Sequence, residues 1–230
     1  MRELWPGGLR YAGDAVGADS ILLADFAAGA GGERCCDLGC GSGIIMLLLA
    51  WENPEMELHG VEIRPSAVEL CRGNIRANGL EARCRAHLSD WRESVLSPGS
   101  MDLVVSNPPY FPAGTSRPSP DSDRALMRVE SSTLPELCQA AARLLRAGGS
   151  FCLVHRTERM AQVFSALEGA GLTPRRLRLF AEKEGSAPPL FLCQARKSAP
   201  GGLRTEPMLF QFGPDGAETE EYRRICHWEA

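Results

Sequence analysis

The sequence has little lysine, no long apolar run and no CxxC pair of cysteines. Lys183 and Lys197 are the only lysines among 230 residues, so arginine carries nearly all of the positive charge. No stretch approaches the roughly eighteen consecutive apolar residues that a membrane-spanning helix requires. The first residues lack the apolar core of a secretory signal. We therefore expect an intracellular protein that does not enter a membrane.

The nine cysteines do not follow a metal-binding pattern. No CxxC pair occurs, and the four histidines are scattered along the chain. Cys35 and Cys36 fall in an apolar segment typical of a buried strand, where cysteine behaves as a small hydrophobic residue. We therefore predict buried thiols and no metal site.

The composition is that of an ordinary globular protein. Hydrophobic residues make up 44% and charged residues 23%, which excludes a disordered or collagen-like chain. A length of 230 residues suits one domain. The formal net charge of −4 does not by itself suggest a nucleic-acid-binding protein, although the planar arginine side chain suits contacts with phosphates and bases.

Strand-like and helix-like segments alternate along the chain. The expected helices cover 18–28 (with Asp19 or Ser20 as N-cap), 44–51, 65–77, 134–145, 159–170 and 219–226. The expected strands cover 34–38, 56–62, 82–87, 101–106, 150–155, 175–181 and 190–196. The last two strands have no helix between them, which favours an antiparallel pair. The alternation predicts an α/β fold with a doubly wound, mostly parallel sheet.

The first feature that carries chemistry is the turn D-L-G-C-G-S-G at 37–43, between a strand and a helix. Glycines let the backbone pass close to a ligand, and the helix N-terminus offers N–H donors. The acidic Asp37 disfavours a phosphate and suits an ammonium or hydroxyl group. Glu62, at the end of the next strand, is placed to accept from both hydroxyls of a ribose, and Asp90 from an adenine amino group. The turn therefore predicts a nucleoside-cofactor site.

The second feature is N-P-P-Y-F at 107–111, which ends the fourth predicted strand. An amino group conjugated to a ring is a poor nucleophile because its lone pair is delocalised. The Asn107 side-chain oxygen and the Pro108 carbonyl would each accept one of its hydrogens and localise the lone pair. Tyr110 would stack on the planar group. Both features lie at carboxyl ends of strands, where doubly wound sheets bind ligands.

The glycine turn, Glu62 and the 107–110 signature together resemble class I S-adenosylmethionine-dependent methyltransferases that act on planar nitrogens. The resemblance covers residues 9–196. Within that class the chain is similar to the tRNA1(Val) adenine-37 N6-methyltransferase family, because D-S-I-L-L-A-D-F at 19–26 directly precedes the glycine turn and an Arg-x-Glu element follows N-P-P-Y-F. This implies a Rossmann-like sheet of seven strands with an antiparallel last strand, S-adenosyl-L-methionine as cofactor, tRNA as substrate and a cytoplasmic location.

The resemblance also implies roles for single residues. The cofactor-binding residues would be Asp19, Asp37, Gly39, Gly41, Gly43, Glu62, Ile63, Asp90 and Asn107. The catalytic residues would be Asn107, Pro108, Pro109 and Tyr110. The substrate-binding residues would be Tyr110, Phe111, Arg124 and Arg128. The whole chain, 1–230, would form a single methyltransferase domain, with 1–30 as a helical lead-in and 198–230 as a C-terminal extension.

Two features depart from the family pattern. The Arg-His-Glu element of the family is here Arg128-Val129-Glu130, without the histidine. The acidic net charge also fits poorly with tRNA, because RNA binding depends on phosphate neutralisation. A basic edge would have to come from local arginines, either Arg117, Arg124 and Arg128 or Arg175, Arg176 and Arg178.

Several other functions remain open. Protein glutamine N5-methyltransferases share Asn-Pro-Pro-Tyr but usually carry a helical domain before the glycine turn, and only 36 residues precede Asp37 here. Methylation of an amino group in rRNA or DNA uses related signatures. A non-catalytic cofactor- or RNA-binding module is a further alternative. A nicotinamide-dependent oxidoreductase is the weakest, because it leaves Asn-Pro-Pro-Tyr unexplained.

Overall fold

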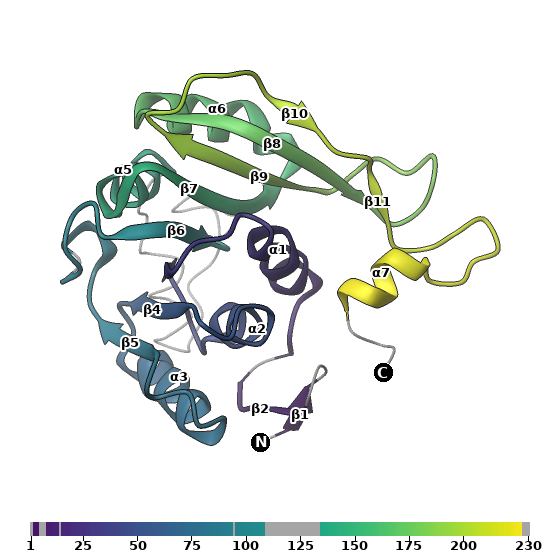
Figure 1. The fold of residues 1–230 in the computed structure, drawn as a ribbon. Helices are drawn as coiled ribbons and strands as arrows, with labels where there is room; N and C mark the ends of the chain where they lie inside the picture. The colour runs from purple at the N-terminus through teal and green to yellow at the C-terminus, as the bar shows by residue number, and fades with distance from the viewer. Residues whose placement is uncertain (1, 5–7, 14, 94, 109–133, 227–230) are drawn as a thin grey trace, which may run out of the picture.

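A nine-stranded mixed sheet is the centre of the structure, a computed structural model that describes residues 2–4, 8–13, 15–93, 95–108 and 134–226 (Figure 1). The strand order is β10-β8-β9-β7-β6-β3-β4-β5, and β11 pairs with β8 beside β10. The strands of this sheet are β3 (Arg34–Leu38), β4 (Glu57–Glu62), β5 (Cys84–Leu88), β6 (Met101–Ser106), β7 (Leu145–Arg156), β8 (Leu172–Ala181), β9 (Leu190–Lys197), β10 (Arg204–Thr205) and β11 (Leu209–Phe210).

The predicted fold class is confirmed. The seven strands expected from the sequence form the continuous order β8-β9-β7-β6-β3-β4-β5, and β9 runs antiparallel to both of its neighbours. The other pairings between these strands are parallel. The sheet is therefore doubly wound and mostly parallel, with an antiparallel last strand.

Helices cover both faces of the sheet, and each face has its own hydrophobic core. The described α-helices are α1 (Ala18–Ala28), α2 (Ile44–Glu52), α3 (Pro65–Ala77), α5 (Leu134–Leu144), α6 (Met160–Gly169) and α7 (Glu220–Ile225). Side chains of α1, α2, α3 and α7 belong to one core, and those of α5 and α6 to the other. Strands buried from both sides become continuously apolar, which explains segments such as Leu103–Val104–Val105.

Local sequence explains several helix ends. Pro65 occupies the first position of α3, where its missing N–H leaves no bond unmade, and Gly79 follows the helix with φ +66°. The predicted cap of α1 is wrong. Gly17 is the N-cap, no side chain makes a capping hydrogen bond, and Asp19 and Ser20 both lie inside the first turn.

The structure adds strands that the sequence did not predict. β1 (Arg2–Leu4) and β2 (Leu9–Tyr11) form an antiparallel hairpin before α1. Near the other end of the chain, β10 and β11 pair in parallel with β8 and widen the sheet. All four strands have only two or three residues, too few to show the alternating pattern of a strand.

All nine cysteines are free and buried, as the sequence predicted. Burial raises the pKa of Cys138 and Cys152 to about 12. In the described part of the chain, no three His, Cys, Asp or Glu side chains are placed to share a metal ion. Nor does any helix there have the length and apolar character to cross a membrane.

Candidate cofactor and target site

The carboxyl ends of β3, β4 and β6 bring the predicted site residues to one edge of the sheet. Asp37 is in register with Gly60 of β4 on one side and Val105 of β6 on the other. Glu62 lies two residues after Gly60, and Asn107 lies two residues after Val105. The Ser106 hydroxyl donates to the Leu38 carbonyl at 2.8 Å and fixes the end of β6 against the end of β3. The glycine turn and the start of the Asn-Pro signature are therefore neighbours.

The glycine turn has a backbone shape that only glycine adopts readily. Gly39, Gly41 and Gly43 have φ values of +77°, +54° and +86°. The Gly39 N–H donates to the Val61 carbonyl at 2.8 Å, which holds the turn against the end of β4. A Cβ at Gly43 would lie 2.5 Å from the Cys71 sulfur. The turn therefore requires these glycines for structural reasons as well as for access to a ligand.

Asp37 is a buried acid that has no hydrogen-bond partner among the described residues. Its exposed fraction is 1%, and among the described residues neither carboxylate oxygen has a hydrogen-bond partner. Burial, and to a lesser degree the charge of Glu62, raises the pKa of Asp37 to about 8. A buried polar group without a hydrogen bond costs free energy. An acid in this state fits a cationic or hydroxyl-bearing ligand.

Glu62 is also buried, with 5% exposure, but it is fully hydrogen-bonded. Its carboxylate accepts the backbone N–H groups of Gly41, Ile63 and Arg64, each at 3.0 Å. The Arg64 side chain adds bonds of 3.1 and 3.2 Å, one to each oxygen. Burial alone would raise the pKa of Glu62, but Arg64 and the Gly41 N–H outweigh it and hold the pKa below its usual value.

The predicted adenine side of the site lies at the end of β5. The Ser89 N–H donates to the Glu62 carbonyl, so Asp90 follows directly beside β4. The Asp90 carboxylate accepts from the backbone and side chain of Arg92, whose hydrogen bonds lower the pKa of Asp90. Ile63 is 37% exposed at the end of the neighbouring strand. Trp91, which the sequence analysis missed, has its ring 3.1 Å from where a Cβ on Gly39 would lie.

Asn107 contacts the first turn of α1. Its Nδ2 donates to the Ser20 hydroxyl at 3.2 Å, which turns the amide nitrogen toward the helix. Pro108 is buried beside it. Asp19, the residue before Ser20, adds to the burial effect that raises the pKa of Tyr222 on α7, so it lies within electrostatic reach of that helix. The predicted residues Pro109, Tyr110, Phe111, Arg124 and Arg128 lie outside the described residues.

The N-terminal segment also reaches the glycine turn, which sequence reasoning did not anticipate. The Tyr11 hydroxyl lies 2.5 Å from the Ser42 hydroxyl. The Asn74 side chain, 1% exposed in α3, donates to the carbonyls of Ala12 and Ser42 and accepts from the Ala12 N–H. The available signal was a polar residue on the buried face of a predicted helix. Its partners, up to 62 residues away, were not visible.

The predicted basic edge at 175–178 has structural partners. Arg175 donates to the Pro200 carbonyl, Arg176 stacks 3.9 Å from the Phe26 ring centroid, and Arg178 pairs with Glu221 at 2.7 Å. These contacts fasten β8 to the C-terminal segment, through Arg175 and Arg178, and to α1, through Arg176. The three arginines therefore hold the fold together and do not form an open basic patch.

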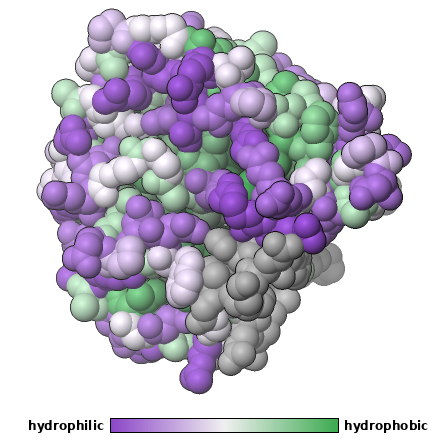
Figure 2. All heavy atoms as spheres, turned by 45° about the vertical axis from the view of Figure 1, so that its right-hand side comes forward, coloured by the Kyte–Doolittle hydropathy of each residue, from purple (hydrophilic) through white to green (hydrophobic). Residues whose placement is uncertain are grey.

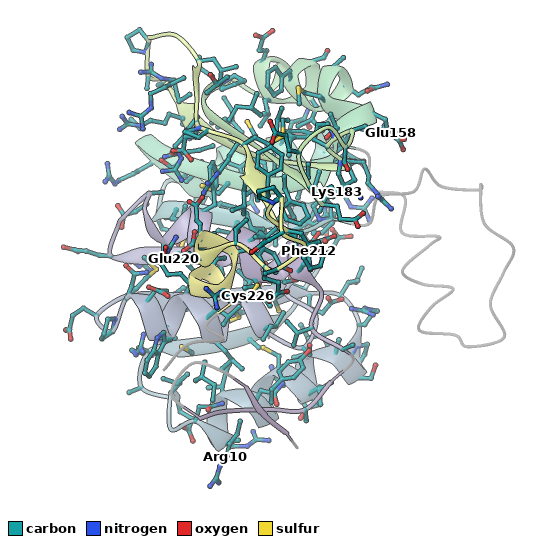
Figure 3. The ribbon with its side chains drawn as sticks, turned by 90° about the vertical axis from the view of Figure 1, so that its right-hand side faces the viewer. Arg10, Glu158, Lys183, Phe212, Glu220 and Cys226 are labelled. Atoms are coloured by element: carbon teal, nitrogen blue, oxygen red, sulfur yellow. The ribbon has the colours of Figure 1, made fainter. Side chains whose placement is uncertain are left out.

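A separate hollow of about 770 Å³ lies beyond the end of β8. Lys183 and Phe212 both line it, and Figure 3 shows these two side chains close together on this side of the molecule. Glu182 and Glu184 flank the lysine, so the wall is not basic. In Figure 2 hydrophilic residues predominate on the face shown, with smaller hydrophobic areas between them.

Comparisons with known proteins agree with this geometry. The family model "methyltransferase small domain" matches residues 11–170. The tRNA1(Val) (adenine(37)-N6)-methyltransferase of Cronobacter sakazakii is 34% identical over 207 residues, which cover 87% of this chain and 81% of that protein.

Solved structures share the fold. A predicted O-methyltransferase from Agrobacterium tumefaciens has a TM-score of 0.75 at 19% identity, over 91% of this chain and 95% of the other. A geranyl diphosphate C-methyltransferase from Streptomyces coelicolor, solved with S-adenosyl-L-homocysteine, has a TM-score of 0.55 at 12% identity, over 76% and 77% of the two chains. At these identities the likeness concerns the fold alone.

Proposed function

The chain belongs to the methyltransferase small domain family and, within it, to the family of the tRNA1(Val) (adenine(37)-N6)-methyltransferases, and we propose that it methylates the N6 amino group of an adenine in tRNA. The methyl donor is S-adenosyl-L-methionine. Such a substrate also implies that the enzyme acts in the cytoplasm.

One observation carries this proposal. Asn107, with its amide nitrogen on Ser20, lies at the end of β6, and the Ser106 bond to Leu38 holds that end against the glycine turn. A residue suited to hold an amino group is thus next to a turn suited to hold the donor. Alignment of two reactants in this way supplies a large share of a rate enhancement.

The residues divide the work between donor and acceptor. S-adenosylmethionine, when bound, supplies an electrophilic methyl group. Asp37 would pair with the ammonium group of its methionyl end, Glu62 would accept from the ribose hydroxyls, and Asp90 from the adenine amino group. Asp19, Ile63, Gly39, Gly41 and Gly43 would complete the walls of this site.

The acceptor is held from the other side. Asn107 Oδ1 and the Pro108 carbonyl would accept the two hydrogens of the target amino group and so localise its lone pair toward the methyl group. Tyr110 would stack on the ring, and Phe111, Arg124 and Arg128 would contact the RNA around it. Pro109 would complete the catalytic Asn-Pro-Pro-Tyr signature. No strong base is needed, because the proton leaves a nitrogen that becomes acidic once methylated.

The test is transfer of a radiolabelled methyl group from S-adenosylmethionine into total tRNA that lacks N6-methyladenosine, followed by nucleoside analysis. We expect label in N6-methyladenosine. Asn107→Ala should reduce turnover by at least about a hundredfold and leave the affinity for S-adenosylmethionine within twofold, because catalytic contacts of this type act on the transition state.

Asn53→Ala is a matched control. Asn53 caps the C-terminus of α2, away from this edge of the sheet, through a hydrogen bond to the Leu49 carbonyl. It should retain full methyl transfer. Label in rRNA, DNA or protein but not in tRNA would overturn the proposed substrate, and label in glutamine would favour the protein-methylating alternative.

A further inference from the structure

The carboxylate that would bind the cofactor ribose already has a full set of hydrogen bonds. A carboxylate offers about four lone-pair sites. Glu62 accepts three backbone N–H groups and two N–H groups of the Arg64 guanidinium. The two ribose hydroxyls therefore cannot be added to Glu62 unless some of these bonds are given up.

The three backbone bonds are fixed by the fold. The Gly41 N–H belongs to the glycine turn, and the Ile63 and Arg64 N–H groups belong to the chain that leaves β4. The Arg64 side chain is different, since rotation about its own bonds removes it without moving the backbone. Its bonds to Glu62 are the ones that a ligand can replace.

Arg64 also lies over the turn itself. Its Nη2 is 3.8 Å from where a Cβ on Gly41 would be, and its side chain is 17% exposed. Gly41 is the glycine in the middle of the turn, over which a cofactor would pass. The guanidinium thus presents two N–H donors to Glu62 from the space next to the glycine turn, which is the arrangement that two ribose hydroxyls would adopt.

We propose that Arg64 is an internal competitor for the ribose position, so that S-adenosylmethionine binds only as the Arg64 guanidinium leaves Glu62. The inference rests on the proposed function of this site. Arg64 then sets the cofactor affinity, because the apparent dissociation constant is the intrinsic one divided by the fraction of molecules in which Glu62 is accessible. Removing the side chain should leave Glu62 oriented by its three backbone bonds and make the cofactor bind more tightly.

A second pair at the site offers a graded comparison. Arg92 donates to the carboxylate of Asp90, two residues before it, just as Arg64 donates to Glu62. The Arg92 side chain is 48% exposed, against 17% for Arg64. Exposed ion pairs contribute little because water competes with them. Displacement of Arg92 should therefore cost less, and Arg92→Ala should tighten cofactor binding less than Arg64→Ala.

The experiment is isothermal titration of the full-length protein with S-adenosylmethionine. We expect Arg64→Ala to bind about tenfold more tightly than the wild type, and Arg92→Ala no more than about threefold more tightly. Arg85→Ala is the matched control, because it removes an arginine that pairs with Glu57 at 2.7 Å, at the opposite end of β4. Its affinity should equal that of the wild type.

The outcomes separate this inference from the proposed function. Equal or weaker binding by Arg64→Ala, with measurable binding by the wild type, would overturn the inference and leave the function standing. Binding by neither protein would instead refute the cofactor assignment. If Arg64→Ala does not fold, Arg64→Gln provides the same test, because a glutamine side chain is too short to present the two-pronged contact of arginine. Tighter binding is not an effect that a merely structural arginine would produce.

Discussion

The ends of β3 and β4 hold two buried acids in opposite states. Glu62 has five hydrogen bonds and a lowered pKa, whereas Asp37, at the end of the adjacent strand, has no hydrogen-bond partner among the described residues and a pKa raised to about 8. The difference comes from the backbone around them. Glu62 follows its strand into a turn whose N–H groups point back at it, while Asp37 lies within β3, where the N–H groups pair with neighbouring strands.

The two acids, Glu62 and Asp37, therefore differ in what they contribute to the structure. Glu62 contributes to the fold before any ligand arrives, because it joins β4 to the glycine turn. Asp37 makes no such hydrogen bond among the described residues, so its replacement should leave the fold intact. Three experiments examine the contrast, beginning with the change of largest effect.

Replacing Glu62 should damage both fold and binding. In Glu62→Gln an NH2 group replaces one of the carboxylate oxygens, so it faces the N–H donors that this oxygen accepted. The Arg64 guanidinium also loses the negative charge with which it pairs. Removal of one partner of a buried ion pair costs about 3 kcal/mol, and loss of the ribose contacts should weaken S-adenosylmethionine binding by about a hundredfold. Urea unfolding and calorimetry would measure the two effects.

Glu57→Gln is the control for that experiment. Glu57 is an acid on the same strand that also pairs with arginine, but its side chain is 35% exposed. We expect it to lose less than about 1 kcal/mol of stability. Equal losses for the two variants would show that the hydrogen bonds of Glu62 are not what stabilises the turn.

Replacing Asp37 should affect binding without damaging the fold. Asp37→Asn removes no hydrogen bond from the described structure, and it no longer carries an acid whose pKa burial raises to about 8, so we expect it to be at least as stable as the wild type at pH 7. Loss of a charge-assisted contact should weaken S-adenosylmethionine binding by about thirtyfold at pH 8. A loss of stability as large as that of Glu62→Gln would contradict the contrast.

The third experiment follows stability against pH. The folded-state pKa of Asp37, about 8, exceeds its ordinary value of 3.8, so the folded protein holds a proton that the unfolded chain has lost. The stability of the wild type relative to Asp37→Asn should therefore fall as pH rises from 6.5 to 8, by at most about 1.4 kcal/mol per pH unit. Melting temperatures of both proteins across this pH range would measure the difference in stability. If the two curves of melting temperature against pH are parallel, Asp37 is ionised in the folded protein throughout the range, which would contradict the prediction.

The sequence predicted the central part of the fold because its local signals agreed with one another. Pro65 and Asn78-Gly79 marked both ends of α3, and the apolar block at 101–106 could only be a buried strand. The glycine turn fixed the point where strand changes to helix. The hairpin β1–β2 and the strands β10 and β11 escaped prediction, since strands of two or three residues form only where a partner strand is already in place.

The site was predictable as a set of residues but not as a set of contacts. Asp37, Glu62, Asp90 and Asn107 could be assigned to one edge because parallel strands end together. The hydrogen bonds from Arg64 to Glu62 depend on side-chain rotamers, which the sequence does not give. The hydrogen bonds from Asn74 to Ala12 and Ser42 depend also on the path of the N-terminal segment. The predicted Asp19 or Ser20 cap failed for a similar reason, since Ser20 lies within α1 and contacts Asn107.

The nine buried thiols make the enzyme its own reporter of unfolding. Alkylating reagents attack only the thiolate, and burial both shields the sulfur atoms and keeps them protonated. When the folded protein is incubated with such a reagent, molecules that have opened globally should collect labels on many cysteines at once, while intact ones carry none. Mass spectrometry would then show two separate populations, and the rate at which the heavy one grows would measure how often the domain opens.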